Sequence, residues 1–299
     1  MKPTPVVRRS ELTCPAHSLK MMAKAAASDA DLVILDLEDA CAVSQKIAAR
    51  QTLIEALTTL DFGAKTVAFR PNNIRTKYHY RDLIEVVEAA GPRIDAVVLP
   101  KSDSADDVLF VDRLLTQIEQ NMGFELGRIK LEVLIESAKA VVNAEAIAAC
   151  SPRMASLIFG IADYAGDIGS REIGAEQFFY HNYPKHRIIA AAKAAGIDAI
   201  DNVTVAFRDL EQCRREAEQA ARMGFDGKWA VHPAQVPVIN EAFTPGEAEI
   251  ARAERIIEAY RRADLEDGLG AIVIDDEMVD AATIRVEAKK LAIARRAGK

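Results

Sequence analysis

The sequence predicts an α/β fold built on parallel strands, and three observations lead to this prediction. Short apolar runs alternate with longer helical patterns along most of the 299 residues, which is typical of strand–helix units in a parallel sheet. Eight such units follow one another, and nearly every apolar run ends at a polar residue. Eight units in a chain of this length favour a TIM (β/α)8 barrel, in which ligands bind where the strands end.

The strands and helices are expected in a regular order. Ser44 and Ser104 are expected helix N-caps, because a serine oxygen can accept a hydrogen bond from the first backbone N–H groups. Residues 164–183 are expected to form a long, irregular connection, and such connections are usually functional. The expected strands cover residues 11–14, 32–37, 66–69, 96–99, 131–135, 156–159, 197–200 and 228–231. The expected helices cover residues 18–28, 44–60, 81–90, a segment after Ser104, a segment up to 149, 184–195 and 209–223.

The chain is expected to divide into a barrel domain of residues 1–244 and an appendage of residues 245–299. The alternation of strands and helices stops before the appendage, which is why the two are treated as separate. The appendage sequence indicates a helix, an exposed turn at 267–270, a short strand at 271–274 and a last helix from about Asp280.

Charge and composition argue against several classes of protein. The net charge is −7, and both signs are mixed along the chain, so no basic stripe indicates a nucleic acid or an anionic membrane as partner. Residues 1–12 lack the apolar core of a signal peptide, and no apolar run reaches the roughly 20 residues of a membrane-spanning helix. The four cysteines form no CxxC pair, which suits reduced thiols in a cytoplasmic protein.

The stretch from Asp31 to Ala40, DLVILDLEDA, places three carboxylates at the end of an expected buried strand. Its run of consecutive apolar residues suits a strand that is buried on both faces of a parallel sheet. Asp36, Glu38 and Asp39 follow directly, and unpaired charge is costly to bury. These side chains therefore need cations, a metal or water where the strand ends.

Two further carboxylates, Glu136 and Asp163, are expected at neighbouring strand ends. A carboxylate pair with open positions suits Mg²⁺, which takes oxygen ligands and keeps several waters. An ion pair of each carboxylate with a nearby Lys or Arg is the alternative, and the residues alone leave both open. His181 and His186 are interpreted as ordinary loop histidines, because Pro184 between them should break a helix that could present both.

Arg70 ends the third expected strand and is a candidate for stabilising negative charge. The planar donor fork of a guanidinium suits a carboxylate or an enolate oxygen. A salt bridge to Asp36, Glu38 or Asp39 is the alternative, and both roles can hold together. Lys101, after the fourth strand, can serve in the same way. The sequence contains no GxGxxG or GxxxxGKS phosphate loop and no GxSxG nucleophile motif, so nucleotide and serine-hydrolase chemistry are not indicated.

Six motifs follow one another along the chain, namely ILDLEDA at 34–40, FRPN at 69–72, LPK at 99–101, IESA at 135–138, GIADYAGDIG at 160–169 and GKWAVHP at 227–233. Together they resemble the citrate lyase beta-subunit-like, or HpcH/HpaI-type, family of CoA-ester lyases. The resemblance extends from about Arg9 to Ala292, and six motifs in this order are specific where one would be weak. Within the family, DFGAKTVAFRPN, SPRM and GKWAVHP look most like malyl-CoA (beta-methylmalyl-CoA) lyases.

The resemblance implies a TIM barrel with a C-terminal helical lid, and chemistry with Mg²⁺, or Mn²⁺, on a thioester of coenzyme A. It implies reversible Claisen cleavage of a 3-hydroxyacyl-CoA, such as malyl-CoA, to glyoxylate and acetyl-CoA. A homotrimer or hexamer that exchanges lids between subunits is implied as well. The implied roles are Glu136 and Asp163 as metal ligands, Arg70 beside the reacting thioester, and Asp280 as a lid aspartate that reaches a neighbouring subunit's site. Glu38 and Asp39 would hold Arg70 and metal-bound waters, and Lys20 and Arg75 are the candidates for the CoA phosphates.

The chain departs from the family pattern at Pro71, at Pro15–Ala16 and at Ala138–Ala140, and its 164–183 connection is shorter than malyl-CoA lyases usually have. These differences bear on the acyl substrate more than on the reaction class. Three alternatives stay open. They are a malyl-CoA-type thioesterase, a citramalyl-CoA or citryl-CoA lyase that works as a citrate-lyase-beta-like subunit beside acyl-carrier partners, and a CoA-independent aldolase for pyruvate-derived substrates.

Overall fold

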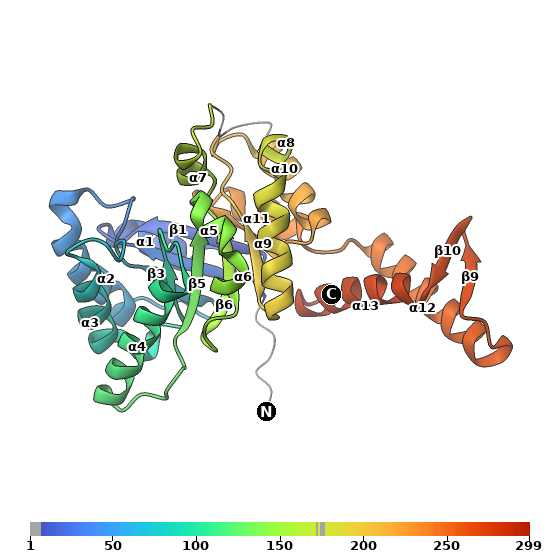
Figure 1. Cartoon of the computed structure of the whole chain (residues 1–299), viewed down its shortest axis with the longest axis horizontal. Coiled ribbons are helices and arrows are strands. Elements are labelled where there is room, and N and C mark those ends of the chain that lie inside the picture. The colour runs from blue at the N-terminus through green and yellow to red at the C-terminus, as the bar shows by residue number, and fades with distance from the viewer. Residues whose placement is uncertain (1–6, 172, 174–176) are drawn as a thin grey trace. The chain divides into compact units, whose positions relative to one another are not determined.

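Eight parallel strands pair in chain order and close into a barrel, because β8 pairs with β1 (Figure 1). The computed structural model describes residues 7–171, 173 and 177–299. The strands are β1 (Ser10–Pro15), β2 (Leu32–Asp36), β3 (Thr66–Arg70), β4 (Ala96–Leu99), β5 (Lys130–Ile135), β6 (Met154–Phe159), β7 (Asp198–Asp201) and β8 (Gly227–Ala230). The predicted TIM-type barrel is confirmed, and every strand lies close to its expected position.

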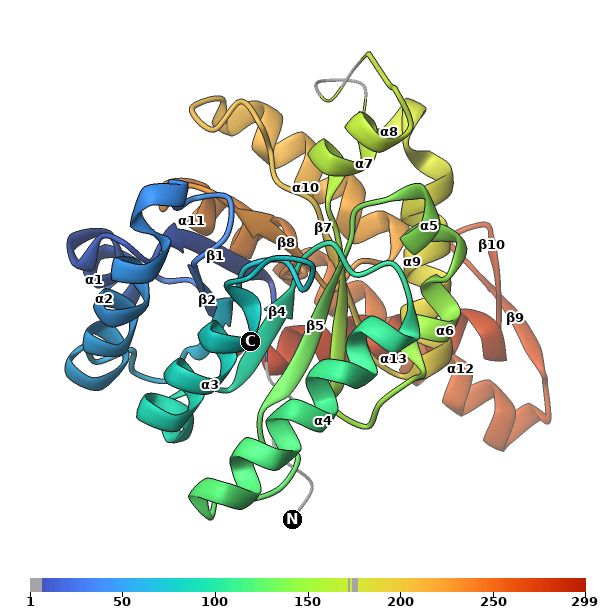
Figure 2. The same cartoon turned by 60° about the vertical axis from the view of Figure 1, so that its left-hand side comes forward.

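Helices follow the strands and cover the outside of the barrel (Figure 2). They are α1 (Leu19–Ala26), α2 (Lys46–Thr59), α3 (His79–Ala90), α4 (Ala105–Met122), α5 (Ala138–Val142), α6 (Ala144–Ala148), α7 (Ile161–Asp167), α8 (Gln177–Tyr180), α9 (Asn182–Ala195), α10 (Leu210–Met223) and α11 (Gln235–Ala242). Two short 3₁₀ helices, η1 (Val43–Gln45) and η2 (Gly91–Arg93), stand before α2 and after α3.

The expectation was wrong for the helix start at Ser44 and was confirmed in position, but not in bonding, for the helix start at Ser104. Ser44 is not an N-cap, because it lies inside η1 and α2 begins after Gln45 without a side-chain cap. The ammonium of Lys46 instead donates to the carbonyls of Leu37, at 3.1 Å, and Glu38, at 2.8 Å, which ties this turn to the end of β2. Ser104 is the N-cap residue of α4, but its hydroxyl bonds the Asp107 carboxylate at 3.3 Å rather than a backbone N–H.

The connection expected to be irregular at 164–183 is partly helical, and its residues 172 and 174–176 lie outside the described part, as do residues 1–6. It contains most of α7 and all of α8, and α9 starts at Asn182. Pro184 does not break a helix here, because it stands in the first turn of α9, where a missing N–H costs nothing. His181 is the N-cap residue of α9 and packs against Tyr164, with ring centroids 5.8 Å apart.

Alternation along the strands decides which side chains reach the end of the barrel. The interior is filled by one cluster of apolar residues, which are Leu32, Ile34, Ala68, Ala96, Val98, Leu134, Ile158, Ile200 and Trp229. Successive strand side chains point to opposite faces. Asp36, Arg70 and Glu136 each come two residues after a member of this cluster, so the sheet directs all three inward at its carboxyl end.

A second group of charges is buried near the amino-terminal ends of the strands. Glu11 of β1 and Glu132 of β5 are both fully buried. The guanidinium of Arg8 pairs with Glu132, lies 3.6 Å from Glu11 and lies 3.4 Å from Asp198. Neither carboxylate oxygen of Glu11 has a hydrogen-bond partner among the described residues. Burial and the charge of Glu132 raise the pKa of Glu11 well above its usual value.

Glu11→Gln should therefore stabilise the protein at alkaline pH. A carboxyl whose pKa is raised by folding contributes stability below its unfolded pKa and loses it as pH rises through the folded pKa. We expect this variant to be about as stable as the native protein near pH 5 and more stable by roughly 1–2 kcal/mol near pH 9, the scale of a buried unpaired polar group. Urea unfolding at both pH values measures this, with the exposed Glu88→Gln as control. A pH-independent difference would contradict the expectation.

Contacts within the chain divide it into two compact units, one of residues Arg8–Asn240 and one that contains Glu241–Lys299. The second unit consists of α12 (Glu247–Asp267), a hairpin of β9 (Ala271–Ile274) and β10 (Glu277–Asp280), and α13 (Ala281–Arg296). Antiparallel pairing sets Val273 opposite Met278. The sequence indicated β9 but not β10, because Glu277 and Asp280 frame only two apolar residues.

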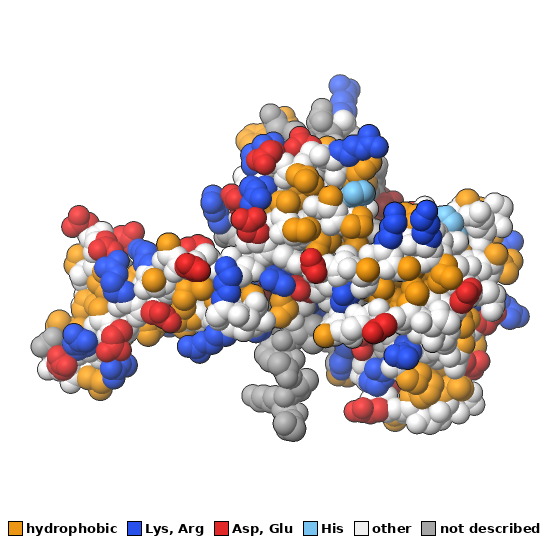
Figure 3. Space-filling model, turned by 180° about the vertical axis from the view of Figure 1, so that it is seen from behind, with side chains coloured by type: hydrophobic (Ala, Val, Ile, Leu, Met, Phe, Trp, Pro, Cys, Tyr) orange, Lys and Arg blue, Asp and Glu red, His pale blue; other side chains and the backbone are white. Residues whose placement is uncertain are grey.

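Positive and negative side chains are interspersed with hydrophobic ones on the face drawn in Figure 3, as the mixed charge pattern of the sequence predicts. All four cysteines are free thiols. None of the helices in the described part of the chain is both long enough and apolar enough to cross a membrane.

Candidate active site

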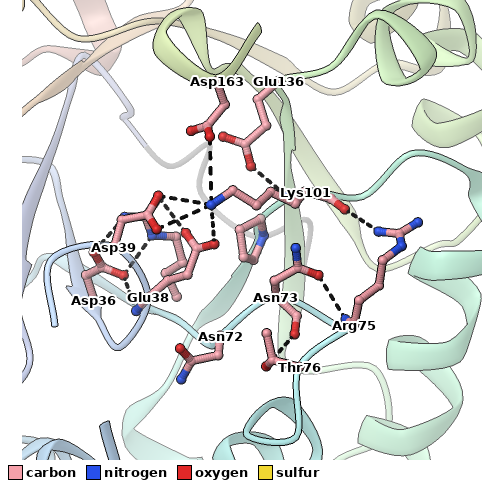
Figure 4. A network of polar contacts seen from close by, with 12 residues as sticks. Asp36, Glu38, Asp39, Asn72, Asn73, Arg75, Thr76, Lys101, Glu136 and Asp163 are labelled. Atoms are coloured by element: carbon pink, nitrogen blue, oxygen red, sulfur yellow. Dashed lines mark hydrogen bonds and ion pairs between the residues drawn. The ribbon is translucent and has the colours of Figure 1, made fainter. Parts of the chain in front are cut away.

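Charged side chains from the ends of five neighbouring strands meet at the carboxyl end of the barrel (Figure 4). They come from the end of β2 and the loop after it, from the end of β3, and from the residues that follow β4, β5 and β6. The set comprises Asp36, Glu38, Asp39, Arg70, Lys101, Glu136 and Asp163. Parallel strands bring their carboxyl ends to one rim of the barrel, which is why residues more than 120 positions apart in sequence become neighbours here.

Arg70 is fixed by the carboxylates that follow β2. Its Nε and NH2 groups donate to the two oxygens of Asp36 at 2.7 and 2.6 Å, and its NH1 lies 3.3 Å from Glu38. The guanidinium also lies over the Trp229 ring, 5.2 Å from the centroid. Burial alone would favour a neutral side chain, but Asp36 and then Glu38 hold the pKa of Arg70 above its usual value. The side chain is therefore a charged, oriented group at the base of the site.

Lys101 is bonded through its backbone as well as its side chain. Its backbone N–H donates to Glu136 at 2.6 Å, and its carbonyl accepts from Arg75 at 2.8 Å. The ammonium lies 2.9 Å from Glu38, 3.2 Å from Asp39 and 3.8 Å from Asp163. These contacts accompany a left-handed backbone, with φ of 50°, which is uncommon for a residue with a side chain.

Glu136 and Asp163 lie together at this rim, as the sequence predicts. The Glu136 side chain is buried, while that of Asp163 is 43% exposed. Asp163 stands in the first turn of α7 rather than in a loop. Burial, and then the charge of Asp163, raise the pKa of Glu136 to about 8. A carboxyl with this environment gains if a cation is placed beside it.

Gly160, just before α7, lets the backbone pass against Glu136. A Cβ at position 160 would lie 2.5 Å from Glu136 Cβ and 2.8 Å from its Oε2. One oxygen of the carboxylate accepts from the Lys101 N–H, and a side chain at position 160 would crowd the other. In the described part of the chain no three His, Cys, Asp or Glu residues are grouped to hold a metal. Two carboxylates without a third protein ligand fit Mg²⁺ or Mn²⁺, which can keep water in the remaining positions.

The other predicted residues of the barrel lie further out. Asp39 is exposed and bonds the Lys101 ammonium. Lys20, in the first turn of α1, is exposed. Arg75 is exposed too, but its guanidinium lies 3.1 Å from Asp103 and 3.4 Å from Asp107. Two carboxylates offset its charge, so Lys20 is the better candidate of the two for an anionic ligand.

Asp280 belongs to the second unit and caps a helix. Its carboxylate accepts hydrogen bonds from the N–H groups of Ala282, at 2.9 Å, and Thr283, at 3.0 Å, at the start of α13. These bonds, first that from Thr283, lower the pKa of the half-buried Asp280. Asp280 is therefore the N-cap of α13, and its role in proton transfer stays a prediction.

Sequence reasoning missed two contributions to the site. Asp36 was considered only as one of three possible partners of Arg70, yet it alone binds both ends of the guanidinium fork. Trp229 by itself gives no functional signal in the sequence, because a single Trp in a short apolar strand is typical of a core residue. The available signal was its motif, GKWAVHP, in which alternation turns position 229 inward.

The family model described as HpcH/HpaI aldolase/citrate lyase matches residues 9–233. An L-malyl-CoA/beta-methylmalyl-CoA lyase of Cereibacter sphaeroides is 38% identical over 95% of this chain and 94% of that protein. A (3S)-malyl-CoA thioesterase of Cereibacter sphaeroides is 35% identical over 91% of this chain and 89% of that protein.

Among solved structures, the protein CitE of Mycobacterium tuberculosis in complex with magnesium, acetoacetate and coenzyme A has a TM-score of 0.80 and 32% identity. The match covers 98% of this chain and 99% of that one. The family model spans about three quarters of the chain, including every charged residue gathered at the barrel rim. The chain belongs to the HpcH/HpaI aldolase/citrate lyase family.

Proposed function

We propose that this chain is a Mg²⁺-dependent carbon–carbon lyase that reversibly cleaves a 3-hydroxyacyl-CoA, such as malyl-CoA, to glyoxylate and acetyl-CoA. The observation that carries the proposal is the arrangement of Glu136 and Asp163 beside a fixed Arg70 at the carboxyl rim of the barrel. The malyl-CoA lyase relatives and the structural neighbour crystallised with magnesium and coenzyme A support the same reaction class.

Glu136 and Asp163 would hold the metal, with Mn²⁺ as a possible substitute for Mg²⁺. When bound, the metal supplies a Lewis acid that polarises the oxygens of the hydroxy acid or of glyoxylate. Arg70 would stabilise the negative charge that develops on the thioester oxygen when the carbon–carbon bond breaks. Its charge is secured by Asp36, and Glu38 supports the NH1 group. Asp39 would act through Lys101 and through water.

Asp280 would transfer the proton. In the condensation direction it would take a proton from the methyl group of acetyl-CoA, and in cleavage it would return one to the same carbon. The lowered pKa of Asp280 keeps its carboxylate ionised, as proton removal requires, and makes it a weaker base than an unperturbed aspartate. We propose that residues 245–299 act as a lid over residues 1–244 of a neighbouring subunit in a homotrimer or hexamer. Lys20, with Arg75 less favoured, would contact the CoA phosphates. The unpaired thiols support a cytoplasmic location.

Product analysis tests the reaction class. The purified chain is given malyl-CoA with Mg²⁺, and glyoxylate and free thiol are measured separately. A lyase releases glyoxylate with acetyl-CoA and no free thiol, whereas a thioesterase, favoured by one relative, releases free thiol and malate. Citramalyl-CoA and citryl-CoA serve as competing substrates in the same assay. Turnover of a 2-oxo acid aldol without CoA would overturn the proposal in favour of a CoA-independent aldolase, and no activity without an acyl-carrier partner would favour a citrate lyase subunit.

Arg70→Lys should lower kcat by roughly 10²-fold or more, which is the scale of losing one oxyanion donor. Lysine keeps the charge but loses the planar fork that binds Asp36 with two bonds. KM should change less, because the lost interaction is strongest in the transition state. Arg81→Lys, an exposed arginine on α3 with a 60% exposed side chain, is the matched control. A near-normal kcat in folded Arg70→Lys would show that Arg70 is structural.

A further inference from the structure

Lys101 connects the two carboxylate groups of the site. Its ammonium lies closest to Glu38, at 2.9 Å, and Asp39, at 3.2 Å, on the loop after β2. The same nitrogen lies 3.8 Å from Asp163, one of the two proposed metal ligands. Figure 4 shows the side chain extended between these groups. No other Lys or Arg of the described residues lies within ion-pair distance of Asp39 or Asp163.

Backbone hydrogen bonds of Lys101 fix the position of this ammonium. The Lys101 N–H is committed to Glu136, and the carbonyl is committed to Arg75. Arg75 is itself anchored by Asp103 and Asp107. Both peptide groups of Lys101 are bonded and its φ is 50°. The direction in which its side chain leaves the backbone is therefore fixed in part by the bond to Glu136, one of the two proposed metal ligands. A left-handed backbone at a lysine costs free energy and persists only where surrounding contacts impose it.

The Lys101 ammonium would repel a metal ion bound at Glu136 and Asp163. A divalent cation held by Glu136 and Asp163 would share Asp163 with a positive charge already 3.8 Å away. Two cations beside the same carboxylate oppose each other, and the site is partly buried, where charges interact more strongly than in water. Without a metal, the same ammonium offsets the mutual repulsion of Asp163, Glu38 and Asp39.

We infer that Lys101 is a positioning residue that acts as an internal counter-ion, competing with the divalent metal for Asp163 and stabilising the carboxylate cluster when no metal is bound. The inference rests on the proposed metal site of the lyase and adds the residue that sets its affinity. It predicts that the native protein binds its metal more weakly, and exchanges it more readily, than its two carboxylates alone would allow.

Binding of Mn²⁺, followed by electron paramagnetic resonance of the free ion, tests the inference without measuring activity. Lys101→Met and Lys101→Asn both remove the charge, and asparagine also tolerates the left-handed backbone. Both should bind Mn²⁺ about tenfold more tightly than the native protein, as expected for removing one like charge a few ångström away from a partly exposed site. Lys101→Arg should stay near the native affinity. Lys130→Met, at the opposite end of β5, controls for net charge and should change nothing.

Thermal unfolding gives a second readout. Mg²⁺ should raise the Tm of Lys101→Met more than that of the native protein, because the uncharged variant has an uncompensated cluster and a tighter site. Added salt should reduce the difference in Mn²⁺ affinity, since Asp163 is exposed enough to be screened. Equal or weaker Mn²⁺ binding by both neutral variants would overturn the inference and leave the metal site standing. A native protein that binds no Mn²⁺ would instead remove the proposed metal site itself.

Discussion

Removal of divalent metal is expected to abolish turnover, and added Mg²⁺ or Mn²⁺ should restore it. The reason is that Glu136 and Asp163 are the only protein carboxylates proposed to hold the metal, and two ligands bind it weakly enough for a chelator to compete. Arg70 alone cannot replace the Lewis acid, because it carries one charge and is already bonded to Asp36. The measurement is the rate of glyoxylate release in excess chelator and after metal is returned.

Glu136→Ala and Asp163→Ala separate loss of metal from loss of fold. Each should bind Mn²⁺ far more weakly than the native protein and release no measurable glyoxylate. The fold should survive, because the pKa of Glu136 is raised by burial. Its ionised form therefore opposes folding above that pKa, and removing it costs little there. Glu145→Ala, on the exposed side of α6, is the control and should keep native activity. Full turnover in excess chelator would contradict the metal proposal.

The sequence predicts the barrel well because the physical signal is local. Buried parallel strands are read as continuous apolar runs, as at Leu32–Leu35, and each helix shows its own period. A polar residue after a buried run must sit where it can be satisfied, so Asp36, Arg70 and Glu136 could be assigned to one rim of the barrel. Their meeting follows from closure of the sheet, which the count of eight units predicts.

Other features depend on contacts that no local pattern contains. Ser44 has the chemistry of an N-cap, but Lys46 reaches back to Leu37 and Glu38 and turns that segment into a 3₁₀ helix. The left-handed backbone of Lys101 arises from bonds to Glu136 and Arg75, which lie 35 and 26 residues away. Propensity alone would place a lysine elsewhere.

The proposed role of Asp280 in proton transfer needs a direct experimental test. The proposal requires its carboxylate to reach a catalytic rim built by another copy of the chain. Asp280→Ala would confuse two effects, since it also removes the cap of α13 and caps contribute about 1 kcal/mol. Asp280→Asn is the sharper variant, because asparagine caps helices as well as aspartate does but cannot transfer the proton. Its rate should fall by roughly 10²-fold or more, in the range of general acid–base catalysis.

Asp209→Asn is the matched control for this variant. Asp209 also caps a helix with its carboxylate, accepting from Gln212 at the start of α10, but it has no proposed role in catalysis. Its activity and Tm should stay close to native. An equal loss of rate in both variants would assign the effect to capping rather than to proton transfer.

Mixing two inactive variants tests whether Asp280 acts on a neighbouring subunit. Asp280→Asn keeps the metal ligands, and Glu136→Ala keeps the lid aspartate, so each alone should be inactive. If lids are exchanged in a closed oligomer, co-refolding equal amounts lets an intact rim of one chain meet an intact lid of another. Random assembly then restores roughly a quarter of the sites. The rim is intact in half of the chains, the lid aspartate is intact in the other half, and the two chains that form a site are drawn independently. If Asp280 instead serves its own chain, every site lacks one group and no activity returns. A fully active monomer in sedimentation experiments at assay concentration would exclude the exchanged arrangement as well.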